Sequence, residues 1–245
     1  SFIGVQKTNS RHQIELLESF VRDELNRSAQ RRMAVLRPLK LTITNWPAGH
    51  VEWVDVVNNP EDESDGTRSV PFSGELWIER DDFMLDAPPK YYRLTPGREV
   101  RLRNAYFVTA SEAVLDADGN VVEVLATYDP ATRGGAAPDN RKDKSTMHWV
   151  SRPHAVDATV HLYERLFQSA HPGADGADPL DDLDPQSRST SAAKAEQALG
   201  EVEPGQVVQF ERLGYFAADL DDPAVFHRTV GLRDEWANIL KQRGG

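Results

Sequence analysis

The spacing of hydrophobic positions predicts one helix near the start of the chain. Apolar residues recur every three or four positions over 14–25, with charged residues on the opposite face, which is typical of an amphipathic helix. Asn9 or Ser10 is expected to cap this helix, because a short polar side chain can accept from the free N–H groups of a first turn. The helix is expected to end within 26–29.

From Met33 onward the pattern changes to short strands. Alternating or β-branched runs predict strands at 39–44, 51–57, 74–79, 145–151 and 207–216, the last as one strand or a pair. The clearest hairpin has arms at 100–114 and 121–128, joined by a turn whose Asp, Gly and Asn residues tolerate left-handed backbone angles. Residues two apart in a strand share a face, so Arg101 and Arg103 are expected to project together.

Other segments have weaker patterns. Residues 160–167 fit a strand or a short helix, 168–205 is the weakest region for regular structure apart from a helix expected at 192–199, and 234–242 is predicted to be a closing helix. Short strands between turn signals are typical of β-barrels rather than of a parallel α/β sheet. Because a polar break at 132–144 divides the strands into two groups, we predict a mainly β chain with two small β-barrels after a helical segment.

Composition is compatible with packed cores. The 245 residues are 39% hydrophobic and include 9 Phe, 6 Tyr and 5 Trp, which argues against a disordered chain. No apolar run reaches the roughly 18 residues of a membrane helix, and no secretory signal is visible, so we expect no membrane partner. The absence of cysteine excludes disulfides and Cys-based metal sites and is compatible with a cytoplasmic location. Residues 1–5 look like the middle of a longer chain, so a fragment is expected.

The net charge of -11, taken alone, argues against nucleic-acid binding. Its distribution matters more than its sum. The segment 89–104 contains five basic residues and only one acid, Glu99, whereas 173–185 contains five Asp and no basic residue. The five basic residues are Lys90, Arg93, Arg98, Arg101 and Arg103. An acidic chain can therefore present a basic face, and its charge permits RNA binding without predicting it.

Signatures of catalysis are missing from the sequence. It contains no P-loop, no nucleophile elbow and no zinc-binding helix, so no catalytic residue is expected. Four histidines between 148 and 171 match no familiar metal spacing, and the Asp-rich run after 173 lacks the EF-hand pattern. We therefore expect scattered histidines, a solvated acidic loop, and neither a metal nor a cofactor in this chain.

The segment 90–93, Lys-Tyr-Tyr-Arg, carries residue types that suit single-stranded RNA. RNA loops are read by stacking unpaired bases on aromatic or guanidinium planes and by hydrogen-bonding the base edges. The planar fork of Arg can bond bidentately to a base or a phosphate. The alternative is that Tyr91 and Tyr92 belong to a strand core and the arginines to a solvated face. Composition alone favours that alternative.

Six groups of residues change this balance, because they resemble, in order along the chain, the motifs of one family. They are 31–35 with 38–41, 70–78 with 82–83, 101–106 (Arg-Leu-Arg-Asn-Ala-Tyr), 147–151 (Met-His-Trp-Val-Ser), 209–212 with 214–216, and 226–236. The ordered set spans nearly the whole chain and is specific, although each group alone is weak. On these residues the chain resembles the C-terminal anticodon-binding region of glutaminyl-tRNA synthetases, which are class I aminoacyl-tRNA synthetases.

The resemblance implies roles for individual residues toward the anticodon loop of glutamine tRNA. Arg31 matches the family arginine at the middle anticodon base, and Gln209 and Arg212 match the residues that converge on the same base. Arg93 matches the arginine at the third base. The pair Arg101 and Arg103 matches residues near the first base and its phosphates. Lys90 and Tyr92 fall in the same region, where other members carry a different polar or basic residue, and the loop 58–64 also departs from the family.

The resemblance also implies a domain layout. Residues 1–32 would form a helical connector from a catalytic domain, 33–140 a proximal barrel completed by 221–245, and 141–220 a distal barrel. The catalytic motifs of the family are missing, so this chain is not expected to catalyse the reaction, whereas the full-length enzyme would ligate glutamine to tRNA with ATP. The resemblance implies that this chain binds tRNA, does not bind DNA and is a monomer. Two alternatives stay open: the same region of an archaeal or eukaryotic glutamyl-tRNA synthetase, and a non-catalytic RNA- or protein-binding β-barrel.

Overall fold

The computed structural model describes residues 14–141 and 145–233 and is mainly β, as predicted. One α-helix, α1 (Ile14–Ser28), precedes the strands and ends where the sequence pattern placed its end. The expected cap at Asn9 or Ser10 and the expected helix at 234–242 lie outside the described residues. Short 3-10 helices connect the strands: η1 Glu63–Asp65, η2 Arg80–Asp82, η3 Pro130–Gly135, η4 Arg152–His154, η5 Ala174–Gly176, η6 Pro179–Asp182 and η7 Gln197–Glu201.

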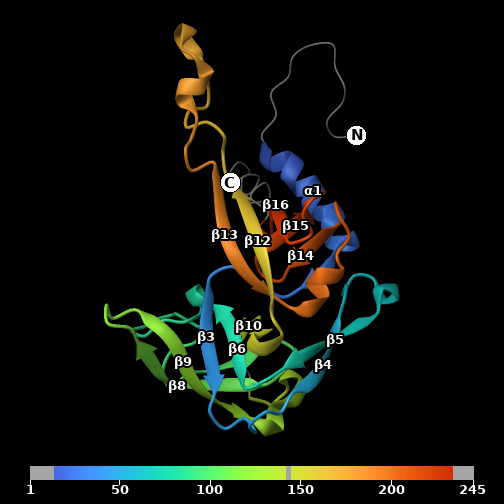
Figure 1. Ribbon diagram of the computed structural model, residues 1–245, viewed down its shortest axis with the longest axis vertical. Helices are drawn as coiled ribbons and strands as arrows, with labels where there is room; N and C mark the ends of the chain where they lie inside the picture. The colour runs from blue at the N-terminus through green and yellow to red at the C-terminus, as the bar shows by residue number, and fades with distance from the viewer. Residues whose placement is uncertain (1–13, 142–144, 234–245) are drawn as a thin grey trace, which may run out of the picture.

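The first barrel is a seven-stranded sheet in the order β10-β7-β8-β9-β3-β6-β11 (Figure 1). Its strands are β3 (Pro38–Ile43), β6 (Glu75–Glu79), β7 (Glu99–Leu102), β8 (Phe107–Leu115), β9 (Val121–Asp129), β10 (Thr146–Met147) and β11 (Val150–Ser151). The hairpin of β4 (Glu52–Val57) and β5 (Thr67–Phe72) packs on the same core. Because β10 and β11 belong to one short segment that pairs with both edges, this segment closes the sheet into a barrel.

The second barrel is closed in the same way, by a segment from the other end of the chain. Its order is β1-β14-β15-β16-β12-β13-β2. The strands are β1 (Gln30–Arg32), β2 (Ala34–Val35), β12 (Val156–Tyr163), β13 (Arg188–Ala195), β14 (Val207–Phe210), β15 (Gly214–Ala218) and β16 (Val225–Gly231). The two edges pair with consecutive parts of 30–35, β1 with β14 and β2 with β13.

The segment 30–35 lies between the two barrels and packs into both. Met33 and Val35 belong to the core of the first barrel, whereas Ala34, between them, belongs to the core of the second. This alternation follows from the strand geometry, in which successive side chains point to opposite faces. The barrels therefore share a buried strand rather than a flexible connection.

The expected domain boundaries differ from this pairing. The sequence analysis assigned 221–245 to the first barrel, but β16, the strand within that range, pairs with β12 and β15 in the second. The segment 146–151, placed with the second barrel, closes the first. Helix α1 packs against the second barrel, where Arg22 Nε donates to the Gly231 carbonyl at 2.8 Å. Helix α1, the expected connector, therefore packs on the second barrel.

Most predicted strands are confirmed, and one predicted helix is wrong. The range 192–199 forms the end of β13 and the start of η7 instead of an α-helix. Its Ala-rich sequence favours a helix locally, but Ala193 and Ala195 alternate into the second core while the strand pairs with β12, and tertiary pairing overrides the weak local preference. The ambiguous range 160–167 contributes to a strand, β12.

The first arm of the predicted hairpin is interrupted. Strand β7 ends at Leu102, and a turn that contains Asn104, whose φ is 57°, leads into β8. The turn at 116–120 between β8 and β9 is as predicted, with the Asp116 carboxylate accepting from the backbone N–H of Asp118 and Asn120. No helix among the described residues is long and apolar enough to cross a membrane.

Candidate nucleic-acid interface

Two of the expected site residues are brought together by the closure of the second barrel. Arg31 in β1 and Gln209 in β14 are register partners, although they lie near opposite ends of the chain. The pairing is parallel and continues through Arg32 opposite Phe210. Arg212 lies two residues after the end of β14, in a turn where its own φ is 67°. The fold therefore places all three in one region, at the end of the second barrel that faces the first.

The guanidinium of Arg31 is directed toward α1. It is 4% exposed and donates to the Ala29 carbonyl, to the Asn26 carbonyl at 2.8 Å and to the Asn26 side chain at 3.1 Å. Since the last carbonyls of a helix have no intrahelical donor, Arg31 satisfies groups that would otherwise be unpaired. Arg31 therefore ties α1 to the second barrel, whatever contact it makes with a ligand.

Arg93 is placed by the loop that follows β6 in the first barrel. The loop is closed at its base by a bridge between Phe83 and Leu94 and by the Leu94 N–H donating to the Asp82 carbonyl at 3.0 Å. Arg93 Nη1 lies 3.0 Å from Asp82 Oδ1 and donates to the Asp81 carbonyl at 3.1 Å. The Arg93 side chain is 45% exposed, so its outer part remains accessible.

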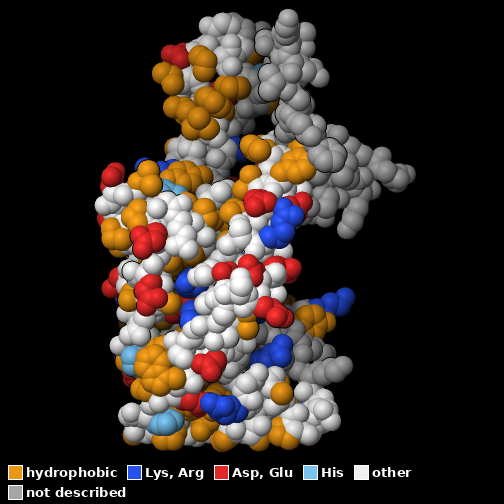
Figure 2. All heavy atoms as spheres, turned by 90° about the vertical axis from the view of Figure 1, so that its right-hand side faces the viewer, with side chains coloured by type: hydrophobic (Ala, Val, Ile, Leu, Met, Phe, Trp, Pro, Cys, Tyr) orange, Lys and Arg blue, Asp and Glu red, His pale blue; other side chains and the backbone are white. Residues whose placement is uncertain are grey.

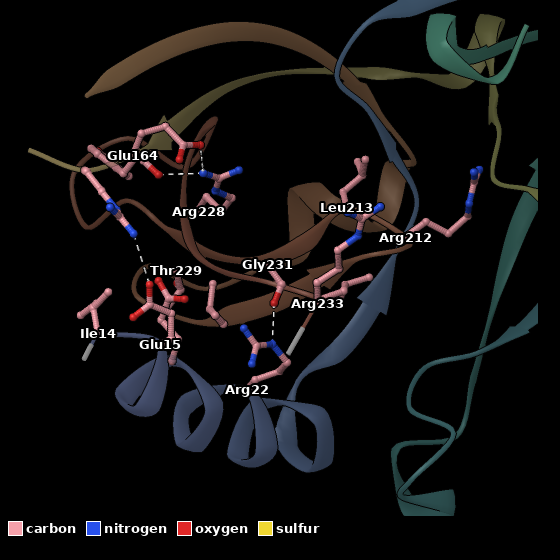
Figure 3. Close-up of a pocket in the computed structure, with 15 residues that line it drawn as sticks. Ile14, Glu15, Arg22, Glu164, Arg212, Leu213, Arg228, Thr229, Gly231 and Arg233 are labelled. Carbon is pink, nitrogen blue, oxygen red and sulfur yellow. Dashed lines mark hydrogen bonds and ion pairs between the residues drawn. The ribbon is translucent and has the colours of Figure 1, made fainter. Parts of the chain in front are cut away.

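Arg212 reaches the same carboxylate from the second barrel. Its Nη1 donates to Asp82 Oδ2 at 2.6 Å and its Nη2 to Asp82 Oδ1 at 2.8 Å, a bidentate pair across the junction of the barrels. Figure 3 shows the Arg212 side chain extending from the edge of the neighbouring groove, away from α1. Burial is the largest influence on the pKa of Arg212 and lowers it, but the hydrogen bonds to Asp82 and the charges of Asp82, Glu79 and Glu211 together raise the pKa overall.

Asp82 is therefore the centre of a cluster drawn from both barrels. Its residue is only 1% exposed, and a buried carboxylate is stable only when it is paired and hydrogen-bonded. Arg93 comes from the first barrel and Arg212 from the second, and both bond Asp82 Oδ1. The sequence analysis did not identify Asp82 as a site residue, because its burial arises from this long-range meeting and not from a local pattern.

A second ion pair crosses the junction beside this cluster. Arg103 Nε lies 2.6 Å from Glu211 Oε2, and Glu211 immediately precedes Arg212. Arg101 is directed elsewhere: its guanidinium donates to Thr146 Oγ1 at 2.8 Å and to the Gly135 carbonyl at 3.2 Å. Arg103 thus belongs to the junction, whereas Arg101 lies against the closing strand of the first barrel. The expected joint projection of these two arginines stops at Leu102, where β7 ends.

The aromatic segment before Arg93 forms part of a loop rather than of a strand. Lys90 is exposed with a φ of 71°, and Tyr92 is 49% exposed. Tyr91 is half-buried, and its hydroxyl donates to the Asp81 carbonyl at 3.3 Å. Burial, followed by the nearby Asp82 charge, raises the pKa of Tyr91. Tyr92 and Lys90 are therefore accessible to a ligand, whereas Tyr91 supports the loop.

His148 extends the polar cluster into the first barrel. It is fully buried, with Nδ1 3.3 Å from Arg212 Nη1 and Nε2 3.7 Å from Glu79 Oε1. The Glu79 carboxylate also accepts from the backbone N–H of Leu36 at 2.6 Å and of Arg37 at 3.1 Å. The motif 147–151 pointed to His148, but nothing in the sequence indicated that it would face Arg212.

A separate buried ion pair fixes the barrels on another side of their junction. Arg68 in β5 bonds Glu196 through Nε at 2.6 Å and through Nη2 at 3.2 Å, and Arg32 Nε lies 4.0 Å from the same carboxylate. Burial raises the pKa of Glu196, against the attraction of Arg68, and burial lowers the pKa of Arg32. The two barrels are therefore held by ionic contacts at both Asp82 and Glu196.

A groove of 770 Å³ lies beside the junction, between α1 and the second barrel (Figure 3). It contains ion pairs between Arg165 and Glu15 at 3.4 Å and between Arg228 and Glu164 at 2.6 Å. Of the expected site residues, Arg212 borders it. Elsewhere, His154, His161 and His227 bond to separate partners, and no group of three metal-ligating side chains occurs within 14–141 and 145–233.

On the face that Figure 2 shows, charge is mixed rather than divided into large areas of one sign. Figure 2 shows basic and acidic side chains interspersed along one face of the molecule. An acidic chain can therefore still offer basic groups to RNA, but only at places where arginine side chains keep accessible donors. Arg93 and Arg103, with side chains that are about equally exposed, meet this condition at the junction.

Comparison with known proteins identifies this arrangement. Two models described as "tRNA synthetases class I (E and Q), anti-codon binding domain" match residues 29–129 and 146–219. Glutamine–tRNA ligases are similar over almost the whole chain. That of Nitrobacter hamburgensis is 53% identical over 97% of this chain and 43% of its own length, and that of Rhodopirellula baltica is 53% identical over 97% and 40%. That of Pseudomonas syringae pv. tomato is 46% identical over 96% and 42%.

The chain thus spans about two fifths of the length of these curated relatives. The two matched ranges together cover more than half of the chain. The first contains most strands of the first barrel, and the second contains β12 to β15 of the second barrel but ends before β16. The sequence, the fold and the comparisons agree, and the chain belongs to the family of anticodon-binding domains of class I tRNA synthetases of the E and Q type.

Proposed function

We propose that this chain binds the anticodon loop of glutamine tRNA at the junction of its two barrels. The observation that carries the proposal is the meeting of Arg93, Arg103 and Arg212 at this junction, beside the register pair of Arg31 and Gln209. A protein that reads unstacked bases needs fixed planar donors with accessible edges, and arginines held by carboxylates supply them.

The anticodons define what such a site has to distinguish. Glutamine codons require CUG or UUG, and glutamate codons require CUC or UUC, so the two sets share the middle U and differ in the third letter. We assign the middle U to Arg31, Gln209 and Arg212, and the third letter to Arg93. The O6 and N7 of guanine can accept a bidentate guanidinium, whereas cytosine presents a donor in the equivalent place.

Arg101 and Arg103 are assigned to the first base and its phosphates, and Lys90 and Tyr92 to the rim of the site. The structure supports Arg103 more directly than Arg101, because Arg103 lies at the junction and Arg101 bonds Thr146 and Gly135. Tyr92 is about half exposed, and its aromatic side chain is of the type on which a splayed base can stack.

The full-length protein is proposed to ligate glutamine to its tRNA with ATP, since the similar full-length proteins are glutamine–tRNA ligases. This chain would supply anticodon recognition and none of the chemistry. We propose a one-to-one complex with tRNA in the cytoplasm, where translation uses the product. The glutamyl-tRNA synthetase alternative is retained only as an outcome of the binding test, because the family description includes both E and Q enzymes.

The test measures binding of the chain to two stem-loops that differ only in the third anticodon letter, at one fixed salt concentration. The wild type should prefer the G-ending loop. Arg93→Ala should weaken that binding and narrow the preference by about 1–3 kcal/mol, the usual value of a good bidentate base contact. Arg212→Ala should weaken binding to both stem-loops about equally.

Arg37→Ala is a matched control, because Arg37 is another exposed arginine near the same turn that pairs with Asp81 rather than with Asp82. It should leave the preference unchanged. A wild type that prefers the C-ending loop would replace the proposal with the glutamyl-tRNA synthetase alternative. If Arg93→Ala keeps the wild-type preference for the G-ending loop, Arg93 does not recognise the third base.

A further inference from the structure

The geometry points to Asp82 as a specificity-determining positioning residue that keeps Arg93 and Arg212 on base edges and away from phosphates. The inference rests on the proposed function and deepens it. It starts from an arrangement that anticodon binding does not by itself require: a buried carboxylate shared by the two arginines that are assigned to two different anticodon letters. A site built only for affinity toward a polyanion would not place a negative charge there.

The first step concerns the orientation of the two guanidinium groups. Asp82 accepts hydrogen bonds from Arg212 through both of its oxygens and forms an ion pair with Arg93 through Oδ1. Asp82 is itself fixed, because it lies in η2 and its carbonyl accepts from Leu94, which closes the loop that carries Arg93. One rigid anion therefore sets the planes of two donors that come from different barrels.

The second step concerns which donors remain for a ligand. Within the described residues, the Arg93 side chain contacts Asp82 and the Asp81 carbonyl, and both contacts use Nη1. The bonds of Arg212 to Asp82 use Nη1 and Nη2. Nη1 of Arg93 therefore faces the protein, and Nε and Nη2 lie on the side that an RNA base would approach. These two donors match the two acceptors, O6 and N7, on the edge of guanine.

The third step concerns charge. Two arginines alone would carry two positive charges and would attract any phosphate of any RNA, and contacts of this kind carry no sequence information. Asp82 cancels one of these charges and repels a phosphate that approaches the inner side of either fork. A neutral base edge meets no such repulsion. Discrimination often depends on an element that repels the competitor, and here the competitor is the RNA backbone.

The test is the substitution Asp82→Asn, which keeps the shape of the side chain and removes its charge. Binding to the G-ending and C-ending stem-loops is measured over a series of salt concentrations. The preference for G should narrow about tenfold or more, because the base contact loses its fixed donor. The dependence of log K on log salt should become steeper by about 0.7 for each additional phosphate that is bound.

Asp81→Asn is the matched control. It removes a negative charge from the adjacent residue, whose carboxylate is exposed and pairs with Arg37. It should leave both the preference and the salt slope at their wild-type values. A general loss of folding would lower binding to both loops and would not make the salt slope steeper, so the slope separates the proposed role from a merely structural one.

If Asp82→Asn is not folded at the temperature of the assay, Asp82→Glu carries the test. It keeps the charge but moves the carboxylate outward by one methylene, so the salt slope should stay as in the wild type while the preference narrows. A folded Asp82→Asn, or in its place a folded Asp82→Glu, that keeps the wild-type preference overturns the inference. A wild type that binds neither loop refutes the proposed function instead.

Discussion

The buried pair of Arg68 and Glu196 gives the sharpest prediction about stability. Its substitution, Glu196→Gln, keeps the size of the side chain and removes the charge. The Glu196 side chain is 1% exposed, and the two arginines that face it, Arg68 and Arg32, are nearly as buried. The variant therefore leaves buried guanidinium groups without a carboxylate at the contact between β5 of the first barrel and the start of η7 in the second.

The expected cost can be worked from this burial. Removing one partner of a buried ion pair typically costs about 3–5 kcal/mol, because the remaining charge stays desolvated. For comparison, the pair of Arg37 and Asp81 is exposed on both sides, and pairs of that kind contribute about 0–1 kcal/mol. Glu196→Gln should therefore lower the free energy of unfolding by several times as much as Asp81→Asn, although each removes one carboxylate.

The assay is urea unfolding at pH 7, followed by tryptophan fluorescence and by circular dichroism. The double variant Arg68→Met with Glu196→Leu completes the design, because replacing a buried pair by apolar residues of similar size is often neutral or stabilising. A loss below about 1 kcal/mol in Glu196→Gln, equal to that of the exposed control, would show that the pair does not hold the barrels together and would refute the reasoning.

Two further predictions concern the first barrel. Burial, followed by a 2.5 Å hydrogen bond to Glu52, raises the pKa of Tyr106 to about 12, so the stability that the neutral Tyr106 contributes is complete below pH 10 and is lost as the pH rises through about 12. Ultraviolet titration should show a tyrosine that ionises near pH 12 and that Tyr106→Phe removes, and a titration in which Tyr106→Phe removes no such step would contradict this. Gly135 has a φ of 81° and an added Cβ would lie 2.7 Å from the Arg101 side chain, whereas Gly134 has a φ of 77° and open space. Both alanine variants should lose about 1–2 kcal/mol of stability, but only Gly135→Ala should also change the affinity for the stem-loop. If the two variants bind the stem-loop equally well, Arg101 is not part of the binding site.

The sequence predicted the type of fold better than the path of the chain. Strands such as 38–43 and 207–210 follow from alternation, since each lies with one face in a core. The helix expected at 192–199 failed, because pairing with β12 outweighs the local preference of an Ala-rich segment. The sequence also did not predict that 146–151 closes the first barrel and 30–35 the second. These pairings, such as the register of Arg31 with Gln209, depend on contacts between distant segments.

The candidate site divides in the same way. Its arginines were identified by resemblance to a family, and the structure brings Arg93, Arg103 and Arg212 to one junction. Their carboxylate partners were not identified. In the sequence, Asp82 looks like the second of two adjacent surface acids. In the structure, the contact between the two barrels buries Asp82, whereas Asp81 stays exposed. Burial of a charge by a distant element leaves no periodic signal in the sequence.

The way in which each barrel is closed by strands from outside its main segment determines how the chain can fold and where it can be cut. The first barrel is incomplete until 146–151 has been synthesised, and the second requires both 30–35 and 207–231. Contacts of such high sequence separation slow folding, since a long loop must be closed before the pairing stabilises it. A cut at 142–144 would separate each barrel from its own closing strand and leave open sheet edges on both pieces, which are sites for aggregation. The strands of the first barrel all lie within 38–151, whereas the second barrel also needs 30–35 from the far side of the first, so no continuous segment contains the second barrel alone.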